Sequence, residues 1–377
     1  MAIASQGRVT RRGQCLSLRA PGLNTDVHIS AGVIGTLPDV LGSRSALVVV
    51  DASVWRSHRT ILEPLLQTAP GRPHPRLILP GGESIKTPEN LARLWKRCAA
   101  VGLPRDGVIV GIGGGTILDL AGFAAATWMR GTSFVAIPTT LLAAADASVG
   151  GKTAVDLDGL KNPVGAFHAA ETVLIDPDLL ATLPRREWRC GMAEVVKMAV
   201  ISEPKLFRAL EYASQDLRAH LAAGAARSLV PEIGDLPWSE WLQSAVMAKA
   251  RIVAHDFREE GHRRVLNLGH TLAHALEPLL EIPHGEAVAL GLSAVTRAAT
   301  ADGICTVRTR DRILALLQAC GLPTECMPPH LNAVAKYVTR DKKMSEGKVD
   351  WIVPTAIGKV ISAPRLSLTI ILPHLQK

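Results

Sequence analysis

The chain has 377 residues, of which 47% are hydrophobic and 20% charged, a composition typical of globular proteins and long enough for about two domains. No apolar run approaches the roughly 20 residues of a membrane span, and the first residues lack the apolar core of a secretory signal, so we expect a cytoplasmic protein. The formal net charge of +8 comes from dispersed Lys and Arg with few aromatic residues to stack bases, which disfavours nucleic acid and favours an acidic small substrate. The six cysteines include no CxxC pair and fit a reducing compartment.

The first half alternates strongly apolar runs with helical stretches, which predicts a doubly wound α/β domain with a parallel sheet. Five buried strands are expected, in SALVVVDASV, PRLILPGGES, DGVIVGIGGG, SFVAIPTTLL and TVLIDP. From about Arg186 long helical periodicities predict a mostly α-helical second domain. The expected domains are residues 1–185 and 186–377. GAARSLVPEIGDLPWSE is expected to be an irregular connection, and KVDWIVPTAIGKVISA a strand pair.

Two features at strand ends suggest a nucleotide. Asp51 ends the first strong strand, where an acidic residue often accepts a hydrogen bond from a ribose hydroxyl, although such aspartates also simply begin turns. Gly113, Gly114 and Gly115 lie between a strand and a helix, where glycines let the backbone and the helix N-terminus approach a pyrophosphate. The spacing is not the usual GxGxxG, and glycine also serves any strained turn, so both interpretations stay open.

The segment TTLLAAADASVGGKTAVDLDGLKN predicts a glycine-punctuated loop after a buried strand. It carries Asp146, Lys152, Lys161 and Asn162. Loops at the carboxyl ends of parallel strands bind ligands in such sheets, and Lys152 is suited to meet a phosphate as a point charge. An ordinary solvated loop is the alternative.

Charged and imidazole side chains of the second half suggest a metal. Glu194 and Lys197 share one face of a helix that is apolar nearly all round, so they are either a surface ion pair or buried charges that need partners or a metal. His270 and His274 stand one helical turn apart, a spacing that is also common without a metal. Together with His284, Glu194 and His270 would make a three-ligand set with an open position, as in catalytic zinc sites.

Taken together, these motifs resemble the 3-dehydroquinate synthase family from about Ser45 to Lys359. The matching segments occur in one order: PGGESIKT, GIGGGTILDLAGFAAATWMRGTSFVAIPTTLLAAADASVGGKTAV, LKNPVGAFH, LIDPDLLATLPRREWRCGMAEVVK, EEGHRRVLNLGHTLAHALE, HGEAVALG and RDKK. The resemblance implies a homodimeric enzyme with an NAD-binding α/β domain, residues 1–185, and an α-helical metal- and substrate-binding domain, residues 186–377. NAD would be held between the domains, together with a divalent metal, zinc or cobalt.

The resemblance also implies a role for individual residues. Glu194, His270 and His284 would hold the metal. NAD would be surrounded by Asp51, Glu83, Lys86, Gly114, Gly115, Thr116, Asp119, Thr139, Thr140, Lys161, Thr182, Leu183 and Glu187. The substrate phosphate would be met by Lys152, Asn162, Asn267 and His274, with Arg130 reaching over from the partner subunit. Lys249 and Arg263 would bind the substrate carboxylate. Asp146, Lys197 and Glu259 would contact substrate hydroxyls and support the site. A lysine of RDKK would close over the ligand, with Lys343 preferred and Lys342 open as the alternative.

The family reaction converts 3-deoxy-D-arabino-heptulosonate 7-phosphate to 3-dehydroquinate and phosphate in the shikimate pathway. NAD transiently oxidises a substrate alcohol, which acidifies the neighbouring proton so that phosphate can be eliminated. The ketone is then reduced back, and an intramolecular aldol reaction closes the carbocycle. In the family the phosphate itself is thought to take the proton, so no dedicated base is expected.

Several alternatives share this scaffold. Sedoheptulose 7-phosphate cyclases usually carry a histidine where this chain has Glu286, and deoxy-scyllo-inosose synthases should not need Lys249 with Arg263. Aminodehydroquinate synthases share nearly every site residue and stay open. Metal-dependent glycerol-type alcohol dehydrogenases would release NADH, and a nucleotide-binding regulatory module would show no turnover.

The chain departs from the common family pattern in details. Phe257 stands where an acidic residue is more usual, and Ala169 and Ala170 follow His168 where Gln-Pro is frequent. We expect none of these residues to touch a proposed ligand.

Overall fold

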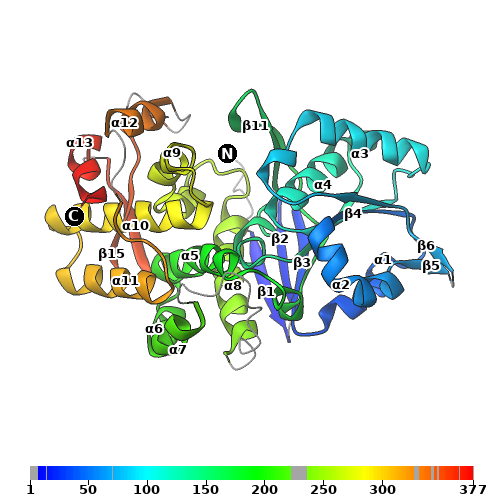
Figure 1. Cartoon of the computed structure of the whole chain (residues 1–377), viewed down its shortest axis with the longest axis horizontal. Helices are drawn as coiled ribbons and strands as arrows, with labels where there is room; N and C mark the ends of the chain where they lie inside the picture. The colour runs from blue at the N-terminus through cyan, green and yellow to red at the C-terminus, as the bar shows by residue number, and fades with distance from the viewer. Residues whose placement is uncertain are drawn as a thin grey trace. The chain divides into compact units, whose positions relative to one another are not determined.

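The apolar runs of the first half form one eight-stranded sheet in the computed structural model, which describes residues 7–13, 15–69, 71–221, 236–326, 331–340, 344–345, 348–364 and 366–376. The strand order is β1-β2-β3-β12-β9-β8-β4-β7 (Figure 1). The strands are β1 (Arg8–Arg12), β2 (Cys15–Ala20), β3 (Leu23–Ile29), β4 (Ala46–Asp51), β7 (Arg76–Leu79), β8 (Val108–Gly113), β9 (Ser133–Pro138) and β12 (Thr172–Ile175). The neighbours from β3 to β7 are parallel, whereas β1, β2 and β3 are antiparallel. The five predicted parallel strands are confirmed as β4, β7, β8, β9 and β12.

Helices cover both faces of the parallel strands. Alternate residues such as Val50 and Ile112 pack in one core cluster with Leu37 and Trp55 from the helices α1 and α2. On the other face α4 lies so close that a Cβ added to Gly111 of β8 would be 3.0 Å from Ala121 Cβ. Because both faces are covered, the strands are apolar throughout rather than alternating. These helices are α1 (Leu37–Leu41), α2 (Ala52–Leu65), α3 (Pro88–Ala100) and α4 (Gly115–Thr127), with the short elements η1 (Val33–Thr36), η2 (Glu83–Ile85), η3 (Trp128–Arg130), β5 (Gln67–Ala69) and β6 (Arg72–Pro73).

The segment predicted to be a loop after β9 is more regular than expected. It contains a π-helical turn, η4 (Ala143–Ala147), and an antiparallel hairpin of β10 (Lys152–Leu157) and β11 (Leu160–Phe167). The hairpin turns at Asp158 and Gly159, both with positive φ. Its glycines and charges indicated a loop, but cross-strand pairing decides the structure. The 3-10 turn η5 (Pro177–Leu180) follows β12.

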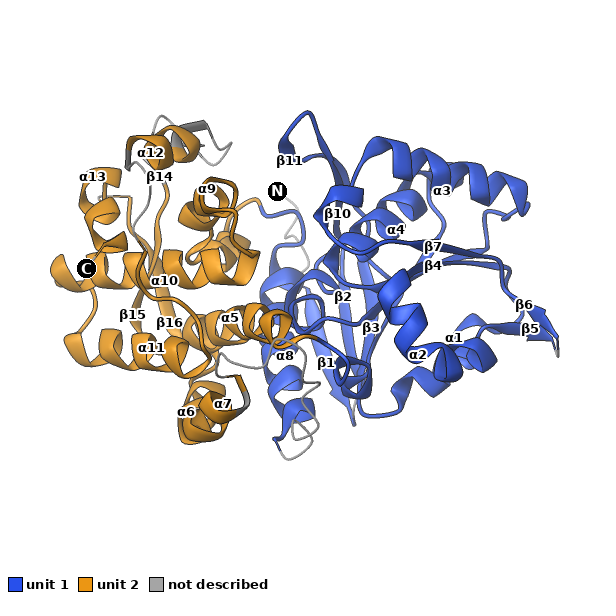
Figure 2. Ribbon diagram, in the orientation of Figure 1, with its two compact units in different colours: residues 1–183, 236–259 blue, residues 184–235, 260–377 orange. Residues whose placement is uncertain are grey.

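The chain divides into two compact units, coloured separately in Figure 2. Unit 1 comprises Met1–Leu183 and Leu236–Glu259, and unit 2 comprises Pro184–Asp235 and Glu260–Lys377. The predicted domains, residues 1–185 and 186–377, placed Leu236–Glu259 in the second half. In the structure this segment falls in unit 1, because the helix α8 (Trp238–His255) packs against β1, β2, β3 and η4.

Unit 2 is mostly helical, as the periodicity predicted. Its helices are α5 (Arg185–Ser202), α6 (Pro204–Tyr212), α7 (Ser214–Leu221), η7 (His262–Asn267), α9 (His270–Leu280), α10 (His284–Ala301), α11 (Val307–Ala319), α12 (Leu331–Arg340), α13 (Leu368–Ile371) and η8 (Leu372–Leu375). The expected terminal strand pair is confirmed as β15 (Ile352–Ala356) and β16 (Lys359–Ser362), and β13 (Met344–Ser345) pairs with β14 (Lys348–Val349). The expected irregular connection falls largely on residues 222–235, outside the described residues.

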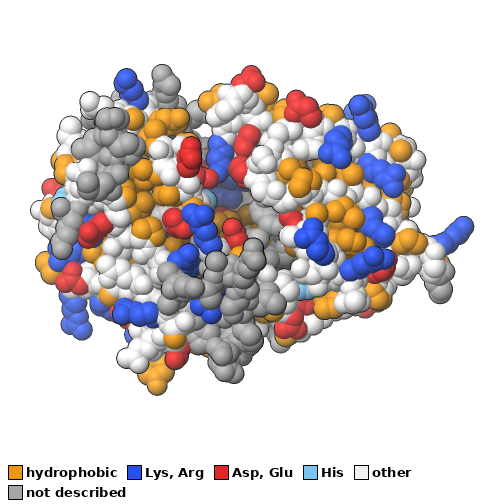
Figure 3. Space-filling view, viewed as in Figure 1, with side chains coloured by type: hydrophobic (Ala, Val, Ile, Leu, Met, Phe, Trp, Pro, Cys, Tyr) orange, Lys and Arg blue, Asp and Glu red, His pale blue; other side chains and the backbone are white. Residues whose placement is uncertain are grey.

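Surface properties agree with the dispersed charge of the sequence. On the face drawn in Figure 3, Lys and Arg side chains are interspersed with acidic and apolar ones. Among the described helices, none combines the length and apolar character needed to cross a bilayer.

Candidate active site

The glycine turn after β8 brings α4 close to its own strand. A Cβ on Gly113 would lie 2.7 Å from Ile117 Cβ, and one on Gly114 would lie 3.1 Å from Thr140 Cγ2. Gly114 is the N-cap of α4 and Gly115 its first residue, so backbone N–H groups of a 13-residue helix are presented at this turn. Thr139 donates its backbone N–H to the Gly113 carbonyl over 3.0 Å. The turn thus has the backbone geometry that an anionic group requires.

Asp51 fulfils the structural role that its position suggested. Its Oδ1 accepts hydrogen bonds from the backbone N–H groups of Ser53, at 2.7 Å, and Val54, at 3.3 Å, and so caps α2. A Cβ added to Gly81 would lie 2.4 Å from Asp51 Oδ2, so the loop after β7 runs directly along this carboxylate. The helix cap occupies Oδ1, and a ribose hydroxyl would have to be met by Oδ2.

A polar network surrounds Lys86 in unit 1. The buried Lys86 Nζ lies 2.6 Å from Asp119 Oδ2 and contacts Asn162 Oδ1 and, at 3.8 Å, Glu83 Oε1. Glu83 also accepts from Thr116 Oγ1, at 2.9 Å, and pairs with Lys161 at 3.4 Å. Burial raises the pKa of Asp119 to about 6, against the opposing effect of Lys86. The pKa of Glu83 is lowered because Lys86 and Lys161 outweigh its burial.

This network joins residues that the sequence had assigned to two different ligands. Asn162 was predicted to meet a phosphate, whereas its partner Lys86 was predicted to meet NAD. Since Asn162 uses its carbonyl oxygen on Lys86, its amide N–H₂ is the group that an anion would meet.

Two other residues of the predicted NAD set hold structural contacts. Thr140 Oγ1 accepts from the backbone N–H of Ala143, at 3.1 Å, and so helps to start η4. Thr182 Oγ1 lies 2.8 Å from Nε2 of His58, a buried residue of α2 that sequence reasoning missed. Leu183 is buried in unit 1, while Glu187 lies in the first turn of α5 in unit 2, where burial raises its pKa.

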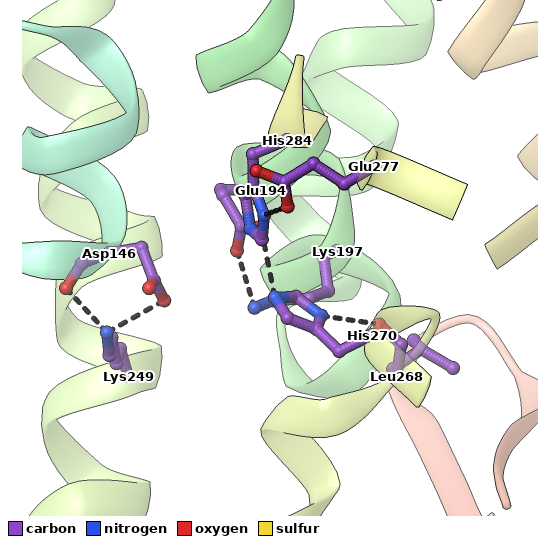
Figure 4. A network of polar contacts seen from close by, with 8 residues as sticks. All are labelled: Asp146, Glu194, Lys197, Lys249, Leu268, His270, Glu277 and His284. Atoms are coloured by element: carbon purple, nitrogen blue, oxygen red, sulfur yellow. Dashed lines mark hydrogen bonds and ion pairs between the residues drawn. The ribbon is translucent and has the colours of Figure 1, made fainter. Parts of the chain in front are cut away.

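Two ion pairs connect α8 and the following turn to the segment after β9. Lys249 Nζ lies 2.5 Å from the backbone carbonyl of Asp146 and 2.7 Å from its Oδ1, as Figure 4 shows. Lys152, the first residue of β10, contacts Glu259 through Nζ and Oε2. The π-helical turn η4 is what directs Asp146 towards α8, and such turns are frequent at functional sites. Both pairs lie within unit 1.

Glu194 of α5 is the buried centre of a cluster in unit 2, whose histidines are half-buried. Its Oε1 lies 3.5 Å from His270 Nε2 and 3.7 Å from His284 Nε2, and its Oε2 lies 2.5 Å from Lys197 Nζ (Figure 4). Glu194 and Lys197 are 0% and 1% exposed, so the ion pair is drawn inside rather than displayed on the surface. One ligand atom from each of Glu194, His270 and His284 lies within 4.8 Å of the others.

The two histidines are oriented by acceptors on their other ring nitrogen. His270 Nδ1 lies 3.2 Å from the Leu268 carbonyl, and His284 Nδ1 lies 3.1 Å from Glu277 Oε2. Both Nε2 atoms are thereby directed towards Glu194, the arrangement by which outer carboxylates and carbonyls orient metal-binding imidazoles. Burial alone would lower the pKa of His284, but hydrogen bonding to Glu194 and Glu277 outweighs it and raises the pKa to about 9. The carboxylates therefore favour a cation here, and this donor set of two nitrogens and one oxygen fits zinc or a similar ion.

Close helix contacts hold the cluster together. A Cβ on Gly285 of α10 would lie 2.3 Å from the Cys190 carbonyl oxygen of α5, and one on Gly291 would lie 2.0 Å from the Gly269 carbonyl oxygen. Gly269, with φ 78°, precedes α9, which begins at His270 itself. The predicted histidine helix is thus confirmed from His270 onwards, whereas the preceding residues form the 3-10 turn η7.

The remaining predicted residues are distributed over both units. His274 lies on α9 with its ring centroid 5.9 Å from that of His270, and Arg263 and Asn267 lie on η7, where Arg263 is 2% exposed. Arg130 is an exposed residue with φ 64° between α4 and β9. Lys249 belongs to unit 1 and Arg263 to unit 2, so their joint use on one carboxylate stays a prediction. Lys342 and Lys343 lie outside the described residues.

Sequence reasoning missed Glu277 and the packing of Phe257. Glu277 follows His270 by seven residues, two helical turns, and that spacing was the available signal. Phe257 was expected to touch no proposed ligand, and its ring lies against Gly151, the neighbour of Lys152: a Cβ added to Gly151 would lie 2.8 Å from it.

Comparison with known proteins agrees with this geometry. The N-terminal model of 3-dehydroquinate synthase matches residues 76–190, and the C-terminal model matches residues 191–344. The 3-dehydroquinate synthase of Acaryochloris marina is 40% identical over 329 residues, which are 86% of this chain and 85% of that protein.

Two solved structures share the fold over nearly the whole length. The 2-epi-5-epi-valiolone synthase of Streptomyces hygroscopicus subsp. jinggangensis 5008, solved with NAD+ and Zn2+ bound, matches with a TM-score of 0.83 at 27% identity, over 94% of this chain and 96% of that one. A 2-deoxy-scyllo-inosose synthase, complexed with carbaglucose-6-phosphate, NAD+ and Co2+, matches with a TM-score of 0.78 at 25% identity, over 94% and 97%. With both family models matched in sequence over most of its length, the chain belongs to the 3-dehydroquinate synthase family.

Proposed function

We propose that this chain is a 3-dehydroquinate synthase, a carbon–oxygen lyase that converts 3-deoxy-D-arabino-heptulosonate 7-phosphate to 3-dehydroquinate and phosphate. The observation that carries the proposal is the fully buried Glu194 facing His270 and His284, in a chain 40% identical to a named synthase. Lys197 pairs with Oε2 of Glu194, while Oε1 faces the two oriented imidazoles as a further ligand atom, and the family chemistry needs a metal.

The two cofactors of the proposal are NAD and a divalent metal, zinc or cobalt. When bound, NAD would take and return a hydride while the metal polarises the substrate oxygens. Glu194, His270 and His284 would hold the ion, and Lys197 would balance the charge of Glu194. The glycine turn at Gly114 and the carboxylate of Asp51 are placed at strand ends, where dinucleotides bind in such sheets.

The other residues would bind and orient the substrate. Lys152, Asn162, Asn267 and His274 would donate hydrogen bonds to the phosphate. Lys249 and Arg263 would bind the carboxylate, with Asp146 fixing the ammonium of Lys249 at 2.7 Å. Glu259 would fix Lys152 in the same manner, and Lys343 would close over the ligand. Since the leaving phosphate is expected to take the proton, precise positioning is what the chain contributes.

The proposed enzyme is a cytoplasmic homodimer. All six cysteines are free, which supports a reducing compartment. Arg130 of the partner subunit would reach the phosphate. The turn at Met129 and Arg130 is exposed and left-handed, which supports a role for Arg130 beyond its own subunit. Strained backbone of this kind is retained where surroundings or function require it.

The test is to incubate the purified protein with catalytic NAD, with zinc or cobalt, and with the carboxylated heptulosonate phosphate or sedoheptulose 7-phosphate in parallel. We expect phosphate release and a carbocyclic product from the first substrate alone, without net NADH. Turnover of sedoheptulose 7-phosphate would instead move the chain to the cyclitol synthases and leave Lys249 and Arg263 unexplained. Net NADH release would indicate a dehydrogenase.

A further inference from the structure

The aromatic ring of Phe257 packs against the backbone of Gly151, the residue before Lys152. It follows α8 in unit 1 and is 7% exposed. A Cβ added to Gly151 would lie 2.8 Å from both Cε2 and Cζ of its ring, and 3.1 Å from the backbone nitrogen of Ala169. No side chain larger than hydrogen fits at residue 151 while the ring is there. Gly151 also has φ 67°, a conformation that favours glycine.

The same ring contacts the residue opposite Lys152. Lys152 and Phe167 are cross-strand partners at the open end of the β10–β11 hairpin. The rings of Phe167 and Phe257 meet edge to face, with centroids 5.7 Å apart and an interplanar angle of 63°. Aromatic pairs in this geometry contribute about 0.5–1.5 kcal/mol beyond area burial. Phe257 therefore packs on both backbone neighbours of Lys152, one along the chain and one across the strands.

Glu259, the ionic partner of Lys152, stands two residues after Phe257. It has φ 60°, an uncommon conformation for a residue other than glycine. Its backbone N–H reaches the Asp256 carbonyl over 3.4 Å, and Asp256 in turn donates to the Ile252 carbonyl at the end of α8. The turn is thus anchored by α8 on one side and by the buried ring of Phe257 on the other.

The Lys152–Glu259 pair does not hold itself in place. The Lys152 side chain is 50% exposed and that of Glu259 22%, and solvent-exposed pairs contribute about 0–1 kcal/mol. Packing of the backbone on each side therefore contributes to an ordered geometry for such a pair. The ring of Phe257 lies against Gly151, the residue before Lys152, and Phe257 is joined to Glu259 through Arg258.

We infer that Phe257 is a positioning residue, whose ring clamps Gly151 and Phe167 and thereby holds Lys152 against Glu259 for phosphate binding. This inference rests on the proposed function of Lys152. Replacement by Leu or Ala would loosen the clamp. Replacement by Tyr would add an oxygen at Cζ, the atom that abuts Gly151, and would push the two segments apart.

The experiment compares Phe257→Leu, Phe257→Ala and Phe257→Tyr with the wild-type enzyme loaded with NAD and zinc. We expect the KM for the heptulosonate phosphate to rise about threefold for Leu and about tenfold or more for Ala and Tyr, because small misplacements near the reacting groups are costly. The metal content and the Kd of NAD should stay unchanged. Phe207→Leu, at a fully buried ring of α6 in unit 2, is the control: it should lower Tm without changing KM.

A double-mutant cycle with Lys152→Ala separates positioning from general stability. If Phe257 acts through Lys152, Phe257→Ala should have little further effect on kcat/KM once Lys152 is removed. Additive effects, or a fall in Tm with an unchanged KM, would overturn the inference while leaving the function of Lys152 intact. If Lys152→Ala itself leaves kcat/KM unchanged, the proposed phosphate role of Lys152 fails, and the inference with it.

Discussion

Two of the ion pairs among the proposed site residues, one in each unit, are built in opposite ways. In unit 2, Glu194 and Lys197 have side chains 0% and 2% exposed and face each other from one helix. In unit 1, Lys152 and Glu259 are far apart in sequence, partly exposed, and held by turns. Burying charges is expensive, and in the first pair the cost is offset by the close approach of the two opposite charges, 2.5 Å apart. The second pair gains little from its charges and depends on packing.

The largest effect is expected from removing Glu194, which breaks the buried pair and the proposed metal site together. Glu194→Ala should abolish metal binding and turnover, and should cost about 3–5 kcal/mol of stability in the metal-free protein because Lys197 is left as an uncompensated buried charge. Metal content by elemental analysis and Tm would be measured together. Glu194→Gln keeps the shape and separates charge from packing. An active, metal-free variant would refute the ligand assignment.

The variant Arg263→Ala tests the proposed binding of the substrate carboxylate. Arg263 is buried, and loss of one partner from a buried charge-assisted contact costs about 2–5 kcal/mol, so kcat/KM should fall at least about thirtyfold, mainly through KM. Arg264→Ala, at the exposed neighbouring residue, should change little. An unchanged kcat/KM in Arg263→Ala would remove the argument against cyclases of uncharged sugars.

A milder disturbance of the buried cluster is Glu277→Gln. The amide retains the shape but weakens the acceptor at His284 Nδ1, so the Kd of zinc should rise about 10–100-fold, measured by competition with a chelator. The exposed Glu281→Gln is the matched control on the residue after α9. Equal metal affinity in the two variants would mean that Glu277 does not orient His284.

The smallest expected effect is the acid sensitivity of unit 1. Burial lowers the pKa of His58 and of His74, so the unfolded chain takes up protons more readily than the folded one as pH falls below about 6.5. At pH 8 both imidazoles are neutral in the folded and the unfolded chain, so their titration does not change the free energy of unfolding. Between pH 8 and pH 5.5 the unfolded chain binds more protons, and the free energy of unfolding falls. Tm should therefore fall over this range by less in a His58→Gln, His74→Gln double variant. An identical fall in the two proteins would contradict this origin.

Local sequence patterns predicted the strands that are buried along nearly their whole length, and missed the strands that depend on pairing with another strand. The apolar runs of β4, β8 and β9 indicated buried parallel strands, and the structure agrees. Strands β1 to β3 were not predicted: charges such as Arg11 and Arg12 interrupt the alternation in β1, whereas β2 and β3 alternate buried and more exposed residues and carry a signal that the prediction did not use. The glycines and charges of the hairpin β10–β11 predict a loop, whereas the structure forms strands because residues as far as 15 apart, Lys152 and Phe167, pair across it.

The candidate site shows the same division. Glu194, His270 and His284 were named from helical spacing and family resemblance, and the structure brings their side chains together. The contact of His58 with Thr182 and that of Phe257 with Gly151 span more than 100 residues, and no periodicity in the sequence reports on them. Each of these contacts is a consequence of how elements distant in the chain pack together.

The glycines at 285 and 291 have an implication for interpreting natural variation. A single methyl group at either residue would collide with the backbone of α5 or with Gly269, and would separate helices that carry different ligands. A homologue with alanine there could preserve every ligand and every charged residue of the site, yet bind its ion poorly. When a function is assigned to a homologue, Gly285 and Gly291 should therefore be checked together with the residues that perform chemistry.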